Sequence, residues 1–63
     1  FKVDNPSKLQ RLEIRNMTGA IVQPIEVIKH QEFYRQSIDH LVMGTYILIV
    51  QSDGSVRNYK FIK

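Results

Sequence analysis

The last third of the chain, from Ile38 to Lys63, constrains the fold more than any other part. Residues 45–50 are an unbroken run of β-branched, aromatic and aliphatic residues. The run is too rich in strand formers for a helix and far shorter than the roughly 18 apolar residues of a membrane-spanning helix, so it predicts a strand buried on both faces. Asp53-Gly54 supplies tight-turn chemistry, because glycine tolerates positive φ. Residues 56–62 return as the partner strand, which predicts a terminal β-hairpin.

The length of 63 residues and the absence of cysteine limit the fold to one small domain without disulfides. A chain this short buries only about 60% of the surface that its unfolded form exposes, so we expect modest stability. Nine Lys and Arg against six Asp and Glu give a net charge of +3, which a solvated surface explains. The chain shows no signal-peptide pattern and opens in strand-like sequence without methionine. We therefore expect a fragment or a domain excised from a longer protein.

The first part of the chain alternates short strand patterns with turn residues. Phe1–Val3 alternates apolar and polar residues. Within Leu9–Arg15, Leu12 and Ile14 fall on one face, and Arg and Glu residues fall on the other. Asn16–Gly19 is turn sequence in which the glycine occupies a position that needs left-handed φ. Ala20–Val22 is therefore expected to return as a short strand.

The middle of the chain gives the weakest pattern. Pro24 fits an edge strand, because proline has no N–H to donate to a ladder. Residues 25–28 and 33–38 can be extended on either side of a polar loop, and a short helix over residues 26–35 is the alternative, although neither a cap nor a 3.6-residue stripe supports it. Six to seven short strands joined by Gly, Pro and Asn turns predict an all-β fold, a small antiparallel immunoglobulin-like β-sandwich.

Residues 39–44 predict a compact corner before the long strand. Asp39 can bond nearby backbone N–H groups, Leu41 can close the end of a core, and Gly44 allows a sharp bend.

The polar residues of this region do not predict catalysis. Ser37, Asp39 and His40 are close in sequence, but neighbours along a strand point to opposite faces, so they do not suggest a catalytic triad. His30 and His40 lack the cysteines or clustered carboxylates that would complete a metal site. No glycine-rich phosphate loop is present. We expect no enzymatic activity, no metal and no cofactor.

Nucleic-acid binding is a further alternative, because a small β domain with tyrosines, phenylalanines and basic residues can stack bases on a sheet. Yet Tyr46 lies in the most apolar run and Phe61 alternates with Lys60, so most rings are expected in the core. The basic residues are scattered among carboxylates and form no stripe. We therefore expect no nucleic-acid partner.

Apolar residues continue to the last positions of the chain, with Lys60 and Lys63 between and after them. Two explanations compete. The last strand closes the sheet with its lysines in water, or an exposed strand end and carboxylate are offered to a receptor by strand addition or carboxylate capture. The residues alone favour the first explanation.

Three blocks of the chain resemble the C-terminal sorting domains of the type IX secretion system of Bacteroidetes (type A, the Por secretion system). Leu12–Val22 resembles the family's strand, Asn/Asp-x-x-Gly turn and strand block, Ile38–Tyr46 its Ile-Asp-x-Leu-x-x-Gly-x-Tyr block, and Tyr59–Lys63 its closing lysine-containing block. The resemblance covers residues 9–63. The family's opening Tyr-Pro-Asn-Pro block is not matched, because Asn5-Pro6 lies too close to the first block. Either the first strand has been cut away or the chain is a divergent member.

The resemblance implies a secretion signal over residues 1–63 that directs an N-terminal cargo domain of the same chain across the outer membrane through the type IX translocon. A sortase-like peptidase at the cell surface then removes the domain. The implied location is the periplasm in transit and afterwards the cell surface or the extracellular space. A sandwich that lacks a strand also exposes an edge through which a homodimer can form. The alternative function is an immunoglobulin-like binding or adhesion module of a surface protein.

The resemblance also implies roles for individual residues. The translocon would recognise the end of the chain, namely Lys60, Phe61, Ile62 and Lys63. A second set, namely Gly19, Asp39, Leu41, Gly44 and Tyr46, corresponds to motif positions that define the fold.

Overall fold

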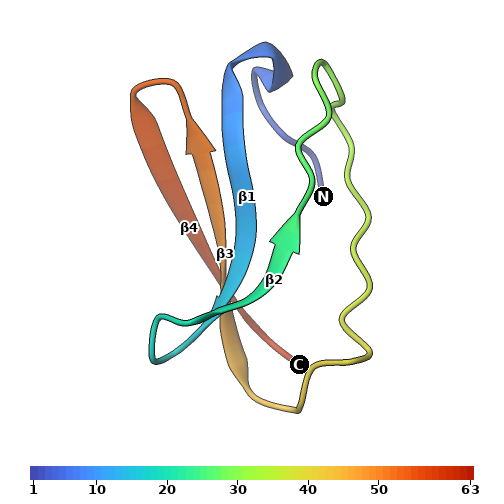
Figure 1. Ribbon diagram of the computed structural model, residues 1–63, viewed down its shortest axis with the longest axis vertical. Coiled ribbons are helices and arrows are strands. Elements are labelled where there is room, and N and C mark those ends of the chain that lie inside the picture. The colour runs from blue at the N-terminus through green and yellow to red at the C-terminus, as the bar shows by residue number, and fades with distance from the viewer.

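The computed structural model describes residues 1–63 and places four antiparallel strands in one sheet (Figure 1). A short 3-10 turn, η1 (Pro6–Lys8), precedes the first strand. The strands are β1 (Leu9–Asn16), β2 (Ile21–Ile25), β3 (Thr45–Ser52) and β4 (Ser55–Ile62). Their order across the sheet is β2-β1-β3-β4, so β2 and β4 are the two edges. No helix of the structure could cross a lipid bilayer.

Alternation along the strands divides the sheet into an inner and an outer face. Leu12, Ile14 and Tyr46 are buried on the inner face, which the N-terminal segment and the long connection from β2 to β3 cover. The outer face carries the alternate residues, with Glu13 of β1 paired with Ile49 of β3. The predicted strand at residues 9–15 and the predicted terminal hairpin are confirmed, and β3 and β4 pair in a register without interruption.

The prediction that residues 45–50 are buried on both faces is wrong. In this strand only Tyr46 is fully buried, and Ile47 and Ile49 are half-buried on the outer face. The segments that pack on the sheet contact its inner face, through residues such as Tyr34 and Leu41. A continuous apolar run here reflects a central strand with one covered face.

The all-β fold is confirmed, but the structure contains four strands instead of six or seven. The N-terminal residues and the segment before the corner form only an isolated bridge between Lys2 and Phe33. The backbone of the connection is bent at His30, whose φ is +66°, and Gln31 N–H closes a turn onto the Ile28 oxygen at 3.1 Å. These turns leave too few consecutive extended residues for a ladder, and no helix forms over residues 26–35.

Two small clusters form the core between the sheet and its irregular cover. The first contains Val3, Leu9, Leu12 and Tyr34, and the second contains Ile14, Leu41 and Tyr46. The Tyr34 hydroxyl accepts a hydrogen bond from Ile28 N–H at 3.0 Å and donates one to the Ile28 oxygen at 3.1 Å. One buried ring therefore fixes the path of the connection, which contains little regular structure.

The two edges of the sheet differ. Pro24 lies in β2, as the edge-strand prediction required, and the pairing of β1 with β2 is irregular between Ile14 and Arg15. The opposite edge, β4, contains no proline and no bulge.

Candidate functional site at the C-terminal strand

The three sequence blocks meet at one end of the sheet. Asn16 of β1 pairs with Tyr46 of β3, which pairs in turn with Phe61 of β4. The β1–β2 turn, the corner before β3 and the C-terminus all extend from this row (Figure 1). The three blocks are therefore adjacent in the folded chain, although they are far apart in the sequence.

The closing block is divided between the two faces of β4. Lys60 and Ile62 lie on the outer face, and Ile62 is 78% exposed. Phe61 turns to the inner face, where its ring stacks on that of Tyr46 at a centroid distance of 5.8 Å. Only Lys60 and Ile62 of this block therefore present their side chains on the outer face.

Lys63 is bound to the corner and does not extend into water as a free lysine. Its ammonium donates hydrogen bonds to the main-chain oxygens of Asp39, at 3.0 Å, and of Leu41. Its own N–H donates to the Gly44 oxygen at 2.8 Å, and Gly44 N–H donates back to the Lys63 oxygen at 3.3 Å. The last residue thus extends the β3–β4 ladder and holds the corner closed, and Figure 1 shows the C-terminus beside that corner.

The corner is held by main-chain groups and by buried rings. Leu41 is buried in the second core cluster, and its N–H closes a turn onto the Ile38 oxygen at 3.0 Å. The Tyr46 hydroxyl donates to the Val42 oxygen at 2.5 Å. Asp39 contributes its main-chain oxygen, whereas its exposed carboxylate makes no hydrogen bond to the backbone N–H groups that the sequence suggested.

Gly44 links the corner to β3 with a φ of +159°, a backbone conformation that L side chains rarely adopt. No atom lies within 4 Å of the position that a Cβ would occupy there. The requirement for glycine at this position therefore comes from the backbone conformation and not from lack of space.

Two exposed apolar side chains next to this site were not among the predicted residues. Val42 and Met43 are 79% and 84% exposed, and they precede Gly44, which is hydrogen-bonded to Lys63. Ile62, which pairs with Thr45 beside Gly44, is a third exposed apolar residue at this end of the sheet. Sequence patterns missed Val42 and Met43 because an apolar residue in an irregular corner carries no periodicity that separates core from surface.

The backbone of β4 has a row of hydrogen-bonding groups that face away from the sheet. Gly44 and Lys63 exchange two hydrogen bonds, so partners alternate from there along the antiparallel pair. The groups of Phe61 and Tyr59 consequently face β3. The backbone N–H and C=O groups of Ile62 and Lys60 face away from the sheet. The same holds for the backbone groups of Asn58 and Val56.

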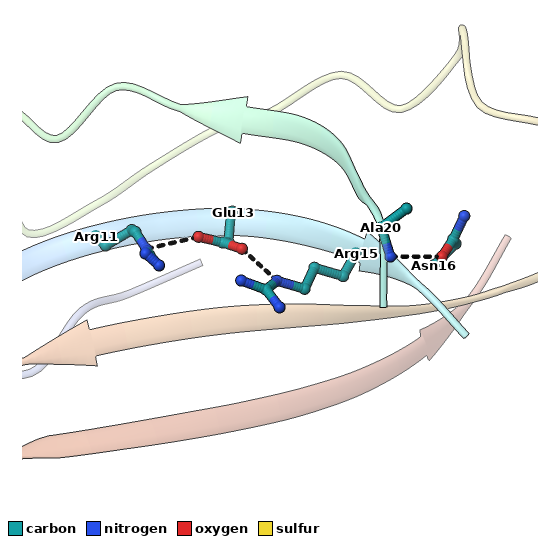
Figure 2. Close-up of polar contacts among 5 residues, drawn as sticks. All are labelled: Arg11, Glu13, Arg15, Asn16 and Ala20. Atoms are coloured by element: carbon teal, nitrogen blue, oxygen red, sulfur yellow. Dashed lines mark hydrogen bonds and ion pairs between the residues drawn. The ribbon is translucent and has the colours of Figure 1, made fainter. Parts of the chain in front are cut away.

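Asn16 organises the turn that contains Gly19. Its side-chain oxygen accepts hydrogen bonds from Thr18 N–H at 3.1 Å, from the Thr18 hydroxyl at 2.7 Å and from Ala20 N–H at 3.0 Å (Figure 2 shows the last). Gly19 has a φ of +89°, the left-handed conformation that the sequence predicted. The signal for Asn16 was its place at the start of the turn, where asparagine commonly bonds the backbone two residues on.

Glu13 is the one buried charged residue, with 2% exposure, although it lies on the outer face. Its carboxylate pairs with Arg11 Nε at 2.7 Å and with Arg15 Nε on the other side (Figure 2). The two arginines belong to the same face of β1, two residues before and after it, and they cover the carboxylate. The Arg-x-Glu-x-Arg spacing could have predicted these ion pairs, because residues two apart in a strand lie on the same face.

Comparison with protein families gives a match that extends over the whole chain. The family model described as "Secretion system C-terminal sorting domain" matches residues 1–63. Comparison with curated proteins and with solved structures gives no significant match. The match supports a type IX sorting signal, which implies attachment to an N-terminal cargo, interaction with the secretion machinery, and delivery to the cell surface or the extracellular space. The chain belongs to the family of type IX secretion C-terminal sorting domains.

Proposed function

We propose that the chain directs its cargo across the outer membrane by presenting the outward side of β4 and the exposed apolar residues at the same end of the sheet to the type IX translocon. The observation that carries this proposal is the division of the closing block. Lys60 and Ile62 are exposed, whereas Phe61 and Lys63 contact Tyr46 and the corner. In this proposal the first pair contacts the receptor, and the second pair holds the strand in position for it.

The proposed contact is strand addition, in which an extended segment of the receptor pairs with an exposed sheet edge. Main-chain pairing suits a receptor that must accept many cargos, because the hydrogen bonds depend on the sorting domain alone. Ile62, Val42 and Met43 add side-chain contacts, and Lys60 adds a positive charge. The domain itself performs no catalysis and binds no cofactor in this proposal.

The proposed sequence of events begins in the periplasm, where the cargo and the sorting domain fold. The translocon then recognises the sorting domain, and a sortase-like peptidase at the cell surface removes it. We also propose that the irregular cover of the inner face corresponds to the second sheet of an immunoglobulin-like sandwich. The antiparallel contacts between the N-terminal residues and the connection support this idea, including Val3 N–H to the Glu32 oxygen at 2.7 Å and Tyr34 N–H to the Phe1 oxygen at 2.8 Å.

The experiment is a secretion assay in two hosts. The chain is fused behind a signal peptide and a folded fluorescent reporter, in one host with a working type IX translocon and in a matched host without it. We expect the reporter outside the first cell and in the periplasm of the second. Reporter retained in both hosts would contradict the proposal and would favour an adhesion module.

Variants of the closing block separate recognition from folding. Lys60→Glu and Ile62→Asp change exposed side chains, so we expect loss of secretion with unchanged thermal unfolding of the purified chain. Phe61→Ala removes a ring packed on Tyr46, so we expect a lower unfolding temperature as well. Full secretion of Lys60→Glu and Ile62→Asp would show that the receptor binds another surface of the domain.

A further inference from the structure

We infer that two copies of this chain associate through their β4 edges, in an antiparallel register centred on Tyr59. The inference starts from the asymmetry of the sheet. Pro24 and an irregular register protect the β2 edge, whereas β4 is a regular strand of eight residues without either device. Unprotected edges of this kind pair with other strands.

The backbone of β4 can pair with itself in this register. The outward groups belong to Val56, Asn58, Lys60 and Ile62, as the hydrogen-bond exchange between Gly44 and Lys63 requires. When Tyr59 lies on the two-fold axis, Lys60 is opposite Asn58 of the second copy, and Ile62 is opposite Val56. In each of these pairs, the backbone N–H and C=O groups of both residues face the second copy. The two residues can therefore exchange backbone hydrogen bonds.

The side chains on the outer face match in the same register. Ile62 and Val56, which are 78% and 59% exposed, lie opposite each other as two apolar residues. Lys60 lies opposite the neutral amide of Asn58, so the four lysine and arginine side chains of the two strands avoid directly opposed like charges.

The inner face is also complementary. Tyr59, which is 50% exposed, meets Tyr59 of the second copy on the axis. Arg57 lies opposite Phe61 of the second copy, an arrangement in which a guanidinium contacts an aromatic ring. Every position from Val56 to Ile62 therefore has a favourable partner, which is why we assign the edge to a second copy of the chain.

Association through one strand from each copy buries little area, so the dimer is weak and depends on concentration. This inference does not rest on the proposed secretion function. The dimer does cover the same outward groups of β4, so self-association and any strand addition by a receptor exclude each other.

The first test is sedimentation equilibrium of the full 63-residue chain over a series of concentrations, with variants at Asn58. We expect the average mass to rise from the 7.4 kDa of the monomer towards twice that value. Asn58→Asp places a carboxylate opposite Lys60 twice per dimer, so we expect the dissociation constant to fall about threefold, and Asn58→Lys should raise it by a similar factor. A constant monomer mass, or equal effects of the two variants, would overturn the inference.

The second test is cross-linking, which the absence of cysteine makes simple. Tyr59→Cys places two thiols on the axis as a non-hydrogen-bonded pair, with Cα atoms about 4.5 Å apart, within disulfide range. Asn58→Cys is the matched control, because its thiols lie two positions out of register. We expect oxidation to link the first variant and not the second, with far-UV circular dichroism confirming that both are folded. Linking of Asn58→Cys alone would overturn the register.

Discussion

The ammonium of Lys63 lies 3.0 Å from the main-chain oxygen of Asp39, and this contact joins the last residue to a corner 24 positions earlier in the chain. The same ammonium also donates to the oxygen of Leu41, a buried core residue. A lysine can satisfy two carbonyls at once because its ammonium has three donors and a flexible stem. The terminal residue of the sorting signal is therefore a structural contact.

Lys63→Ala removes both hydrogen bonds and leaves the carbonyls of the corner to water. We expect the free energy of unfolding to fall by roughly 1 kcal/mol, since hydrogen bonds to charged groups exceed neutral ones but this group is only partly buried. Urea unfolding of the full chain measures the change. Lys60→Ala is the matched control, because Lys60 is exposed and should change stability by less than about 0.5 kcal/mol. Equal losses in the two variants would show that the contact does not stabilise the fold.

Valine substitutions at two glycines test the backbone requirements of the two motif blocks. Gly19 has a φ of +89° and Gly44 a φ of +159°, and neither has an atom within 4 Å of an added Cβ. Backbone strain alone should therefore decide the effect of each variant. We expect Gly19→Val and Gly44→Val each to lower the free energy of unfolding by about 1–2 kcal/mol, because L side chains rarely adopt either φ and a β-branched residue adapts least. Thermal unfolding measures both, and an unchanged unfolding temperature of either variant would show that its glycine is not required.

The parts of the fold that local patterns determine were predictable. The terminal hairpin follows from an apolar run, an Asp-Gly turn and a return strand, all within residues 45–62. The turn around Gly19 and the edge position of Pro24 also depend on local chemistry. These elements have their determining residues next to one another in the chain.

The remaining features depend on contacts between distant segments. The connection at residues 26–44 is fixed by the Tyr34 hydroxyl and by Lys63, neither of which produces a periodic pattern in the connection itself. The half-buried outer face of β3 could not be inferred from its apolar run, because the same run would form a strand covered on one face or on both faces.

Replacing Glu13 tests the buried ion pair on the outer face. Glu13→Gln keeps the shape of the side chain but removes the charge that pairs with Arg11 and Arg15. We expect a loss of about 1–2 kcal/mol in the free energy of unfolding, because the partners are partly exposed and can turn to water. Glu26→Gln, at an exposed position, is the control and should be close to neutral. An unchanged urea midpoint for Glu13→Gln would mean that the pairs contribute nothing to stability.

Asn16 should be the most sensitive position of the β1–β2 turn after Gly19. Asn16→Ala removes the oxygen that accepts bonds from Thr18 and Ala20, so we expect a loss of about 1–2 kcal/mol in the free energy of unfolding. Asn16→Asp keeps an acceptor oxygen at the same place and should stay within about 0.5 kcal/mol of the original chain. Urea unfolding of the two variants shows whether the side-chain oxygen or the side-chain NH2 of Asn16 stabilises the turn. If both variants lost the same stability, the amide NH2 and not the oxygen would hold the turn.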